Sequence, residues 1–181
     1  MVGNRERVLH AAVELLAEKG IRGLTHLQVD SHAALPKGST SNIFRSRAAL
    51  LLGVAQHMAT REQPAVIAGF SAESADELIE SLTQLFHNLV TAGRTTTTAR
   101  LVLFTEAIHD SEVRDALLAG WSLLRVTVRP ALVRLGSPDP DFGVQAIAVC
   151  FEGMFIQVLG RGADVSPERH LAIAVRGALF A

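Results

Sequence analysis

The stretch LPKGSTSNIFRSRAALLLG, residues 35–53, decides how the N-terminal part of the chain folds. Small polar residues run from Gly38 to Asn42, and three cations, Lys37, Arg45 and Arg47, flank them. Glycine, serine, threonine and asparagine rank low as helix formers, so a helix here must be held by packing against its neighbours. A hydrophobic core does not need small polar and cationic side chains, whereas a surface that binds a polar or charged partner needs them.

Two helical patterns precede this stretch. From Arg5 to Lys19 the apolar residues recur at three- and four-residue spacing, and Gly20 follows where a left-handed C-terminal cap is expected. Thr25 and Gln28 then form a capping box that starts a second helix. That helix must be short because Pro36, eleven residues after Thr25, is tolerated only near the first turn of a new helix.

A third helix is predicted over about residues 36–44, with Ile43 and Phe44 on its buried side. A short capped helix, a tight turn and a helix rich in small polar side chains form a helix-turn-helix, whose second helix enters the major groove of DNA. Hydroxyl and amide side chains, together with the backbone amides of a helix start, match phosphate oxygens and base edges.

The charge distribution favours the same interpretation. Residues 1–47 carry seven Lys or Arg against four Asp or Glu, whereas residues 48–181 carry ten against fourteen. A basic end on an acidic body is typical of a protein that meets a polyanion with one end only. Cys150 is the one cysteine of the chain, which excludes an intramolecular disulfide, and no secretion signal pattern opens the sequence, so we expect a cytoplasmic protein.

The rest of the chain is also helical by periodicity, so the predicted fold is all-α. Further helices are expected over about residues 46–61, 74–92, 97–108, 111–135 with a kink at Pro130, 142–159, and 166–180. The run 142–159 is apolar enough to suggest a membrane span, but Gln145, Glu152 and Gln157 interrupt it. We interpret it as a helix buried on most sides inside the protein.

Residues 5–53 resemble the DNA-binding head of the TetR family of bacterial transcriptional regulators. The motifs that carry the resemblance are RVLHAAVELLAEKG (7–20), the link Gly20–Thr25, the start Lys37–Thr40, Phe44, and Ser46-Arg47-x-x-Leu50-Leu51. The resemblance implies a homodimer that binds a pseudo-palindromic DNA operator and responds to a small hydrophobic effector, most often as a repressor. It implies a helix-turn-helix domain over residues 1–47 and a larger helical ligand-binding and dimerisation domain over residues 48–181.

Carried over by position, the family's DNA contacts fall on Thr25, Gln28, Lys37, Gly38, Ser39, Thr40, Ser41, Asn42 and Arg47. The resemblance implies that Lys37, Gly38 and Arg47 face phosphate and that Ser39, Thr40 and Asn42 face bases. Thr25 and Gln28 can touch the backbone or groove edge, or serve only as a capping box. The family often has an aromatic residue at the position of Ser41, so binding here relies more on the cations.

The expected effector site is lined by large apolar residues on predicted helices, namely Phe86, Phe104, Trp121 and Met154. Core packing is the alternative for each of them. The last two helices are expected to form a four-helix contact between two copies of the chain. The residues expected there are Val144, Ile147, Ala148, Phe151, Phe155, Val158, Leu159, Leu171, Ile173, Ala174, Val175, Ala178 and Leu179.

An enzyme is the alternative reading: a helical small-molecule or metal-dependent enzyme with a vestigial head. Glu106 and His109 have the Glu-x-x-His spacing of di-iron helical bundles, but those bundles need the motif twice, with two further glutamates. The sequence has no HExxH motif, CxxC pair, P-loop or GxSxG elbow. We therefore expect no enzymatic activity, no metal and no cofactor.

Overall fold

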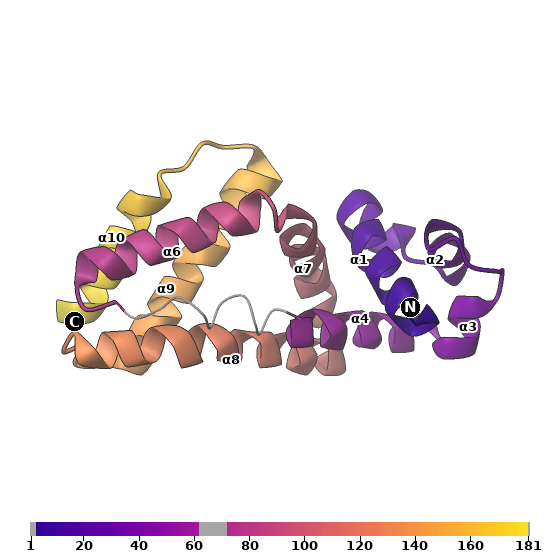
Figure 1. The fold of residues 1–181 in the computed structure, drawn as a ribbon, viewed down its shortest axis with the longest axis horizontal. Coiled ribbons are helices and arrows are strands. Elements are labelled where there is room, and N and C mark those ends of the chain that lie inside the picture. Colours follow the sequence, from indigo (N-terminus) through magenta and orange to yellow (C-terminus); the bar gives the residue numbers. More distant parts are fainter. Residues whose placement is uncertain (1–2, 62–71, 181) are drawn as a thin grey trace. The chain divides into compact units, whose positions relative to one another are not determined.

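The computed structural model describes residues 3–61 and 72–180, apart from the side chains of Arg61 and of residues 119–123. All regular structure in these ranges is helical (Figure 1). In chain order the elements are α1 (Asn4–Gly23), α2 (His26–His32), α3 (Ser39–Ile43), α4 (Arg47–Arg61), α6 (Ala75–Val90), α7 (Arg94–Ala107), α8 (Ser111–Arg134), α9 (Pro140–Phe155), the π-helical turn η1 (Ile156–Gly160) and α10 (Pro167–Phe180). The all-α fold predicted from the sequence is confirmed.

Local capping chemistry explains where several helices begin. The Thr25 hydroxyl accepts a hydrogen bond from the Gln28 amide at 3.3 Å and starts α2. Ser46 accepts from the Ala49 amide at 3.1 Å at the start of α4, and Ser74 caps α6 in the same way. Each bond satisfies an amide that has no partner within the helix, which is why short hydroxyl side chains are favoured there.

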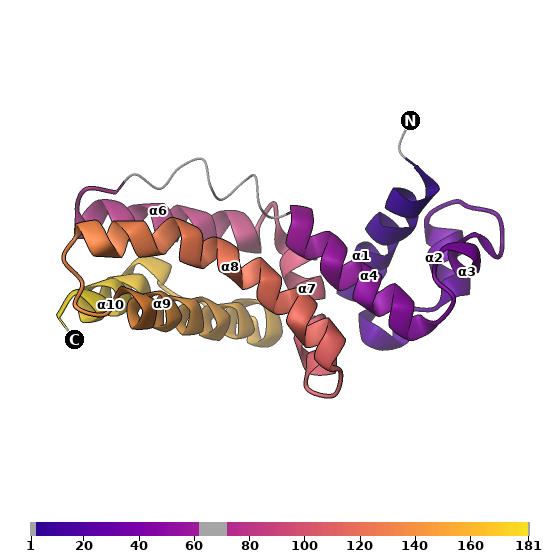
Figure 2. The ribbon, with the colours of Figure 1, turned by 90° about the horizontal axis from the view of Figure 1, so that it is seen from below.

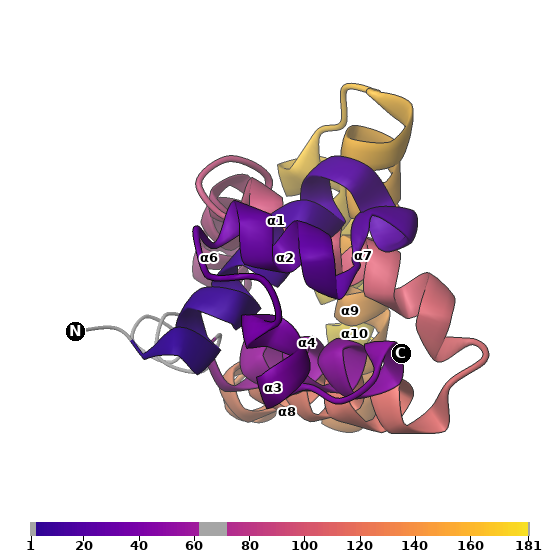
Figure 3. The ribbon, with the colours of Figure 1, turned by 90° about the vertical axis from the view of Figure 1, so that its right-hand side faces the viewer.

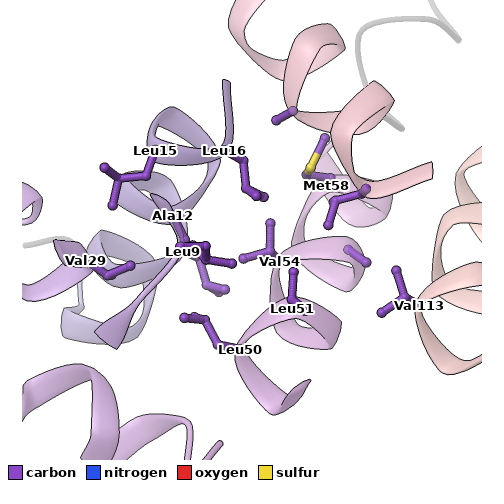
Figure 4. Packing of buried hydrophobic residues seen from close by; sticks show 14 of the residues in the cluster. Leu9, Ala12, Leu15, Leu16, Val29, Leu50, Leu51, Val54, Met58 and Val113 are labelled. Atoms are coloured by element: carbon purple, nitrogen blue, oxygen red, sulfur yellow. The ribbon is translucent and has the colours of Figure 1, made fainter. Parts of the chain in front are cut away.

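The chain divides into two compact units, the first made of residues 1–61 and 94–120 and the second of residues 62–93 and 121–181. In the first unit α1 packs against α2, α3, α4 and α7 (Figures 1 and 3). Its core is one cluster of mostly aliphatic side chains, in which Leu9 and Leu16 of α1 face Leu50 and Val54 of α4 (Figure 4). Burying each such side chain contributes about 1.5–3 kcal/mol, which holds the short helices in place.

In the second unit α10 lies against both α6 and α9 (Figures 1 and 2). The rings of Phe86, Phe151 and Phe155 meet at its centre, with Phe86 and Phe155 stacked at a centroid distance of 5.4 Å. The Ser137 hydroxyl donates to the Ala178 carbonyl at 2.6 Å and ties the turn after α8 to α10. This unit therefore has an aromatic core of its own.

Several boundaries differ from those predicted. The first helix continues past Lys19 to Gly23, across a non-helical Gly20. The third helix begins at Ser39 and not near Pro36, because Gly38 has φ +93°, a left-handed conformation that cannot continue a helix. The helix predicted from 97 begins at Arg94. The helix predicted over 142–159 ends at Phe155 and continues as the turn η1.

The apolar helix near the C-terminus is exposed on one side and buried on the other, which corrects the expectation that it is buried on most sides. Pro140–Gly160 is long and apolar enough, by length and composition alone, to cross a membrane, with a mean hydropathy of 1.7. Residues such as Val144, Ile147 and Phe151 are buried inside the second unit, but only 39% of the apolar window is buried.

Candidate nucleic-acid interface

The start of α3 is organised by a buried carboxylate. Asp30, in α2, is 3% exposed, and its Oδ2 accepts a hydrogen bond from the Gly38 amide at 2.7 Å. Its Oδ1 accepts from the Thr40 amide at 2.7 Å and from the Thr40 hydroxyl at 2.6 Å. Burial by itself raises the pKa of Asp30, but these bonds and the nearby His26 outweigh it, so the pKa lies below its ordinary value. Asp30 is therefore an ionised cap on the start of α3.

The end of α3 is held at Phe44, which is buried and follows the last helical residue. The Phe44 amide donates to the Thr40 carbonyl at 2.8 Å, and the Phe44 carbonyl lies 2.8 Å from Nε2 of His26. Because a carbonyl can only accept, the His26 Nε2 carries the proton. The Arg5 guanidinium lies over the Phe44 ring, 5.4 Å from its centroid.

Most of the predicted contact residues on and around α3 are accessible. Lys37, Ser41 and Asn42 are exposed, and Gly38 and Ser39 are half-buried. The Ser39 hydroxyl donates to the Pro36 carbonyl at 2.6 Å, so this side chain already has a partner in the turn. The exposed side of α3 therefore presents a hydroxyl and an amide, and the turn before it presents an ammonium group.

Thr40 has a different role from the predicted contact with bases. Its side chain is 0% exposed, and its hydroxyl donates to Asp30. The sequence suggested an outward position because the residue is polar and sits among polar neighbours. Its polarity instead serves an internal hydrogen bond, so Thr40 has no surface to offer to a base edge.

Two of the remaining predicted contacts lie on α2 and its cap. Thr25 is exposed, and Gln28 is half-buried with its Oε1 3.4 Å from the Lys19 ammonium. The Thr25 half of the predicted capping box is confirmed, whereas the Gln28 side chain is engaged with Lys19.

Arg47, predicted to hold phosphate, is exposed, but its guanidinium donates to the carbonyls of Ile21 at 2.7 Å and Leu24 at 3.3 Å. These bonds fix the link between α1 and α2. Arg7 plays a similar part, donating to the carbonyl of Ala33 at 2.7 Å. These arginines therefore donate hydrogen bonds to backbone carbonyls at the C-terminal ends of α1 and α2.

Sequence reasoning missed Asp30 and underrated His26. Nothing in the sequence pattern singles out Asp30, and His26 by itself suggests an ordinary surface or turn residue. The signal that could have found the pair is their spacing: residues four apart share one face of a helix. With Val29 as the buried neighbour, that face points into the packed head.

The predicted effector residues are distributed over both units. Phe86 and Met154 are buried in the second unit, and Phe104 packs on the aliphatic core of the first. The side chain of Trp121 lies outside the described residues. Among the described residues, no group of three or more His, Cys, Asp or Glu is placed to hold a metal ion.

The last two helices bury most of the side chains that we expected at a dimer contact. Eight of the expected residues are in the core of the second unit: Val144, Ile147, Ala148, Phe151, Phe155, Leu171, Val175 and Ala178. Ile173, from the same set, is 76% exposed. Other apolar residues face outward instead, namely Phe142, Val149, Ile156 and Phe180. This corrects which side chains are available to a partner.

Comparison with known proteins agrees with this architecture. Residues 73–181 match the family model of the tetracyclin repressor-like C-terminal domain. No curated protein sequence matches the chain.

Among solved structures, the multidrug binding protein EbrR in complex with ethidium is 20% identical, with a TM-score of 0.76 over 96% of this chain and 98% of that one. A transcriptional regulator from Rhodococcus sp. Rha1 is 15% identical, with a TM-score of 0.85 over 98% and 97%. The reduced form of E. coli NemR is 19% identical, with a TM-score of 0.76 over 98% of both chains. At these identities the likeness shows a shared fold.

Transcriptional regulators that carry the tetracyclin repressor-like C-terminal domain are generally not enzymes. The matched model covers more than half of the sequence and includes every described element from α6 to α10. The chain therefore belongs to the TetR family of transcriptional regulators.

Proposed function

We propose that this regulator is a cytoplasmic, ligand-responsive repressor that binds a pseudo-palindromic operator as a homodimer. The observation that carries the proposal is the exposed side of α3, where Ser41 and Asn42 project from a short helix fixed at both ends and Lys37 is exposed in the turn just before it. A rigid, narrow polar helix of this kind suits the major groove. In this proposal residues 1–47 are the DNA-binding domain and residues 48–181 the ligand-binding and dimerisation domain.

Each exposed side chain has a proposed role. Lys37, the Gly38 backbone and the Ser41 hydroxyl face phosphate, while Ser39 and Asn42 lie toward the bases. A guanidinium has five N–H groups, and Arg47 uses some of them to bind the carbonyls of Ile21 and Leu24. Its other N–H groups face phosphate. Thr25 and Gln28 lie at the groove edge.

A homodimer through α9 and α10 is supported by the apolar residues that these helices and η1 expose. Phe142, Val149 and Ile156 follow one another at seven-residue spacing, and so do Ile173 and Phe180. Residues seven apart lie on one side of a helix, so each helix presents an apolar stripe. Two copies that join these stripes about a two-fold axis bring two recognition helices to the operator, with half-sites about 34–36 Å apart or a multiple.

For the effector we propose a moderately hydrophobic small molecule bound within the second unit, in contact with Phe86 and Met154. The similar EbrR structures hold ethidium and proflavin, which are flat aromatic molecules, and this supports an aromatic effector here. The dimer can adopt one state whose two DNA-binding domains are spaced to fit the operator and another state whose spacing does not fit. A ligand that binds the second state more tightly lowers the affinity for DNA, and the size of the effect is set by the ratio of its affinities for the two states. Replacing Met154 by alanine should therefore weaken the ligand response.

The test is enrichment of duplexes from a random DNA pool on the full-length protein. An inverted repeat should emerge, and binding to it should weaken steeply as salt rises, because phosphate contacts release counterions. A pool that stays unselected after repeated rounds would reject the proposal. Light scattering on the free protein at micromolar concentration should give the mass of a dimer, and the mass of a single chain would contradict the assembly.

A further inference from the structure

The recognition helix cannot form by itself. It spans five residues, Ser39–Ile43, most of them weak helix formers. Isolated helices shorter than about 12–15 residues are marginal in water even with the best sequences. Its geometry must therefore be imposed by neighbouring groups. Those groups affect DNA recognition even if they do not contact DNA.

One face of α2 supplies such groups at both ends of α3. His26 and Asp30 are four residues apart, so their side chains leave α2 on the same side, one turn from each other. Asp30 binds the amides of Gly38 and Thr40 at the start of α3, and His26 donates to the Phe44 carbonyl at its end. The polarity is favourable at both ends, since a helix start prefers negative charge and a helix end prefers a hydrogen-bond donor.

The Asp30 end is the stronger of the two. All three of its hydrogen bonds are 2.7 Å or shorter, as expected when a charged acceptor is involved. The Thr40 hydroxyl adds a bond that an apolar residue could not make, and both side chains are removed from water. A buried carboxylate is tolerated only with such donors, so the position of α3 is coupled to the charge on Asp30.

We propose that His26 and Asp30 form a two-point clamp that sets the position of α3 before DNA arrives, with Thr40 as the receiving residue. The clamp rests on the proposed DNA-binding function and adds positioning residues to it. Asp30 does not contact DNA, because a carboxylate facing phosphate would repel it and because its oxygens are occupied. Selectivity for the operator depends on these residues because Asn42, in α3, and Lys37, in the turn before it, reach their targets only when α3 is held in a fixed position.

The first test uses the DNA-free chain. Hydrogen exchange at the Gly38 and Thr40 amides, read by NMR, should be slow in the wild-type chain and at least about tenfold faster in Asp30→Asn, which places an amide group against amide donors. Ser31→Ala, an exposed change at the neighbouring position of α2, is the matched control and should exchange like wild type. Equal protection in Asp30→Asn and wild type would overturn the clamp, independently of any DNA measurement.

The second test measures affinity for the enriched operator and for an unrelated duplex. Asp30→Asn and Thr40→Val should each weaken operator binding by about 10- to 100-fold, the range expected for lost hydrogen bonds to a charged group, and should weaken unrelated-duplex binding much less. The slope of log affinity against log salt should stay at the wild-type value, because no phosphate-binding cation is removed.

The two variants should also be non-additive, because they remove the same bond. If Asp30→Asn does not fold, as judged by its melting curve, Thr40→Val alone carries the test, since valine keeps the shape of threonine. Unchanged discrimination between the two duplexes in a folded variant would overturn the clamp. Absence of any operator for the wild-type chain would instead reject the proposed function.

Discussion

Replacing Gly53 by alanine should displace the end of the recognition helix α3, because Gly53 packs against the Phe44 ring that follows this helix. Gly53 lies in α4 beneath the Phe44 ring, and a Cβ at this position would lie 2.4 Å from Cε1 and 2.8 Å from Cζ of that ring. Contacts under 3.0 Å are essentially never seen for real Cβ atoms, so the ring must move. Because Phe44 also follows the last residue of α3, its movement shifts the end of that helix.

The magnitude follows from two opposing terms. Overpacking a well-filled core costs about 1–3 kcal/mol, whereas replacing glycine by alanine inside a helix gains about 1 kcal/mol. The net change in the free energy of unfolding should therefore be a loss of about 0–2 kcal/mol. Operator affinity should fall more than this loss predicts, since a folded but displaced α3 no longer fits the groove.

Urea unfolding followed by circular dichroism, together with operator binding, checks the reasoning. Gln56→Ala is a matched control, because it introduces the same residue at an exposed position of α4, and it should stay within about 0.5 kcal/mol of wild type. Adding Phe44→Leu to Gly53→Ala should cost less than the sum of the two single changes, because leucine leaves room for the new methyl group. A Gly53→Ala chain that is more stable than wild type and binds the operator normally would refute the argument.

Three further predictions concern the DNA contacts, the assembly and the second core. Lys37→Ala should weaken binding to all duplexes and reduce the salt slope by about one, whereas Asn42→Ala should change preference at particular base pairs; equal, sequence-blind losses would show that this division of roles is wrong. Ile173→Glu, at a side chain that is 76% exposed, should leave the melting of a single chain nearly unchanged but shift light scattering toward the monomer, and a persistent dimer would count against the α10 stripe. Phe86→Ala should cost about 3–5 kcal/mol in urea unfolding, because it removes a buried ring stacked on Phe155, and a loss under 1 kcal/mol would mean that the aromatic core is loosely packed.

Features encoded by local chemistry were predictable from the sequence. The apolar periodicity of α1 and α6, the caps at Thr25 and Ser46, and the left-handed Gly20 each depend on a few consecutive residues. The presence of a short polar helix between α2 and α4 followed from the same kind of reasoning. The start of this helix at Ser39 could not be predicted in this way, because Gly38 has a left-handed conformation and its amide is bound by the carboxylate of Asp30, eight residues away.

Features that depend on packing between elements could not be read from the sequence. Thr40 and Asn42 are both polar and lie two residues apart, yet one is buried against Asp30 and the other is exposed, because only the docking of α3 on α2 decides which side faces inward. The same limit applies to α9, which is apolar on nearly all sides. Its periodicity does not tell Phe151, inside the chain, from Phe142, outside it.

In the proposed complex, two copies of α3 occupy the major groove of one operator. Guanine N7 lies in the major groove, so methylation protection on the enriched operator reports occupancy there directly. We predict two protected patches on the same face of the duplex, separated by about one helical turn of 10–10.5 base pairs or a multiple of it. Protection confined to a single patch, or none at guanine N7 while the protein is bound, would contradict the account.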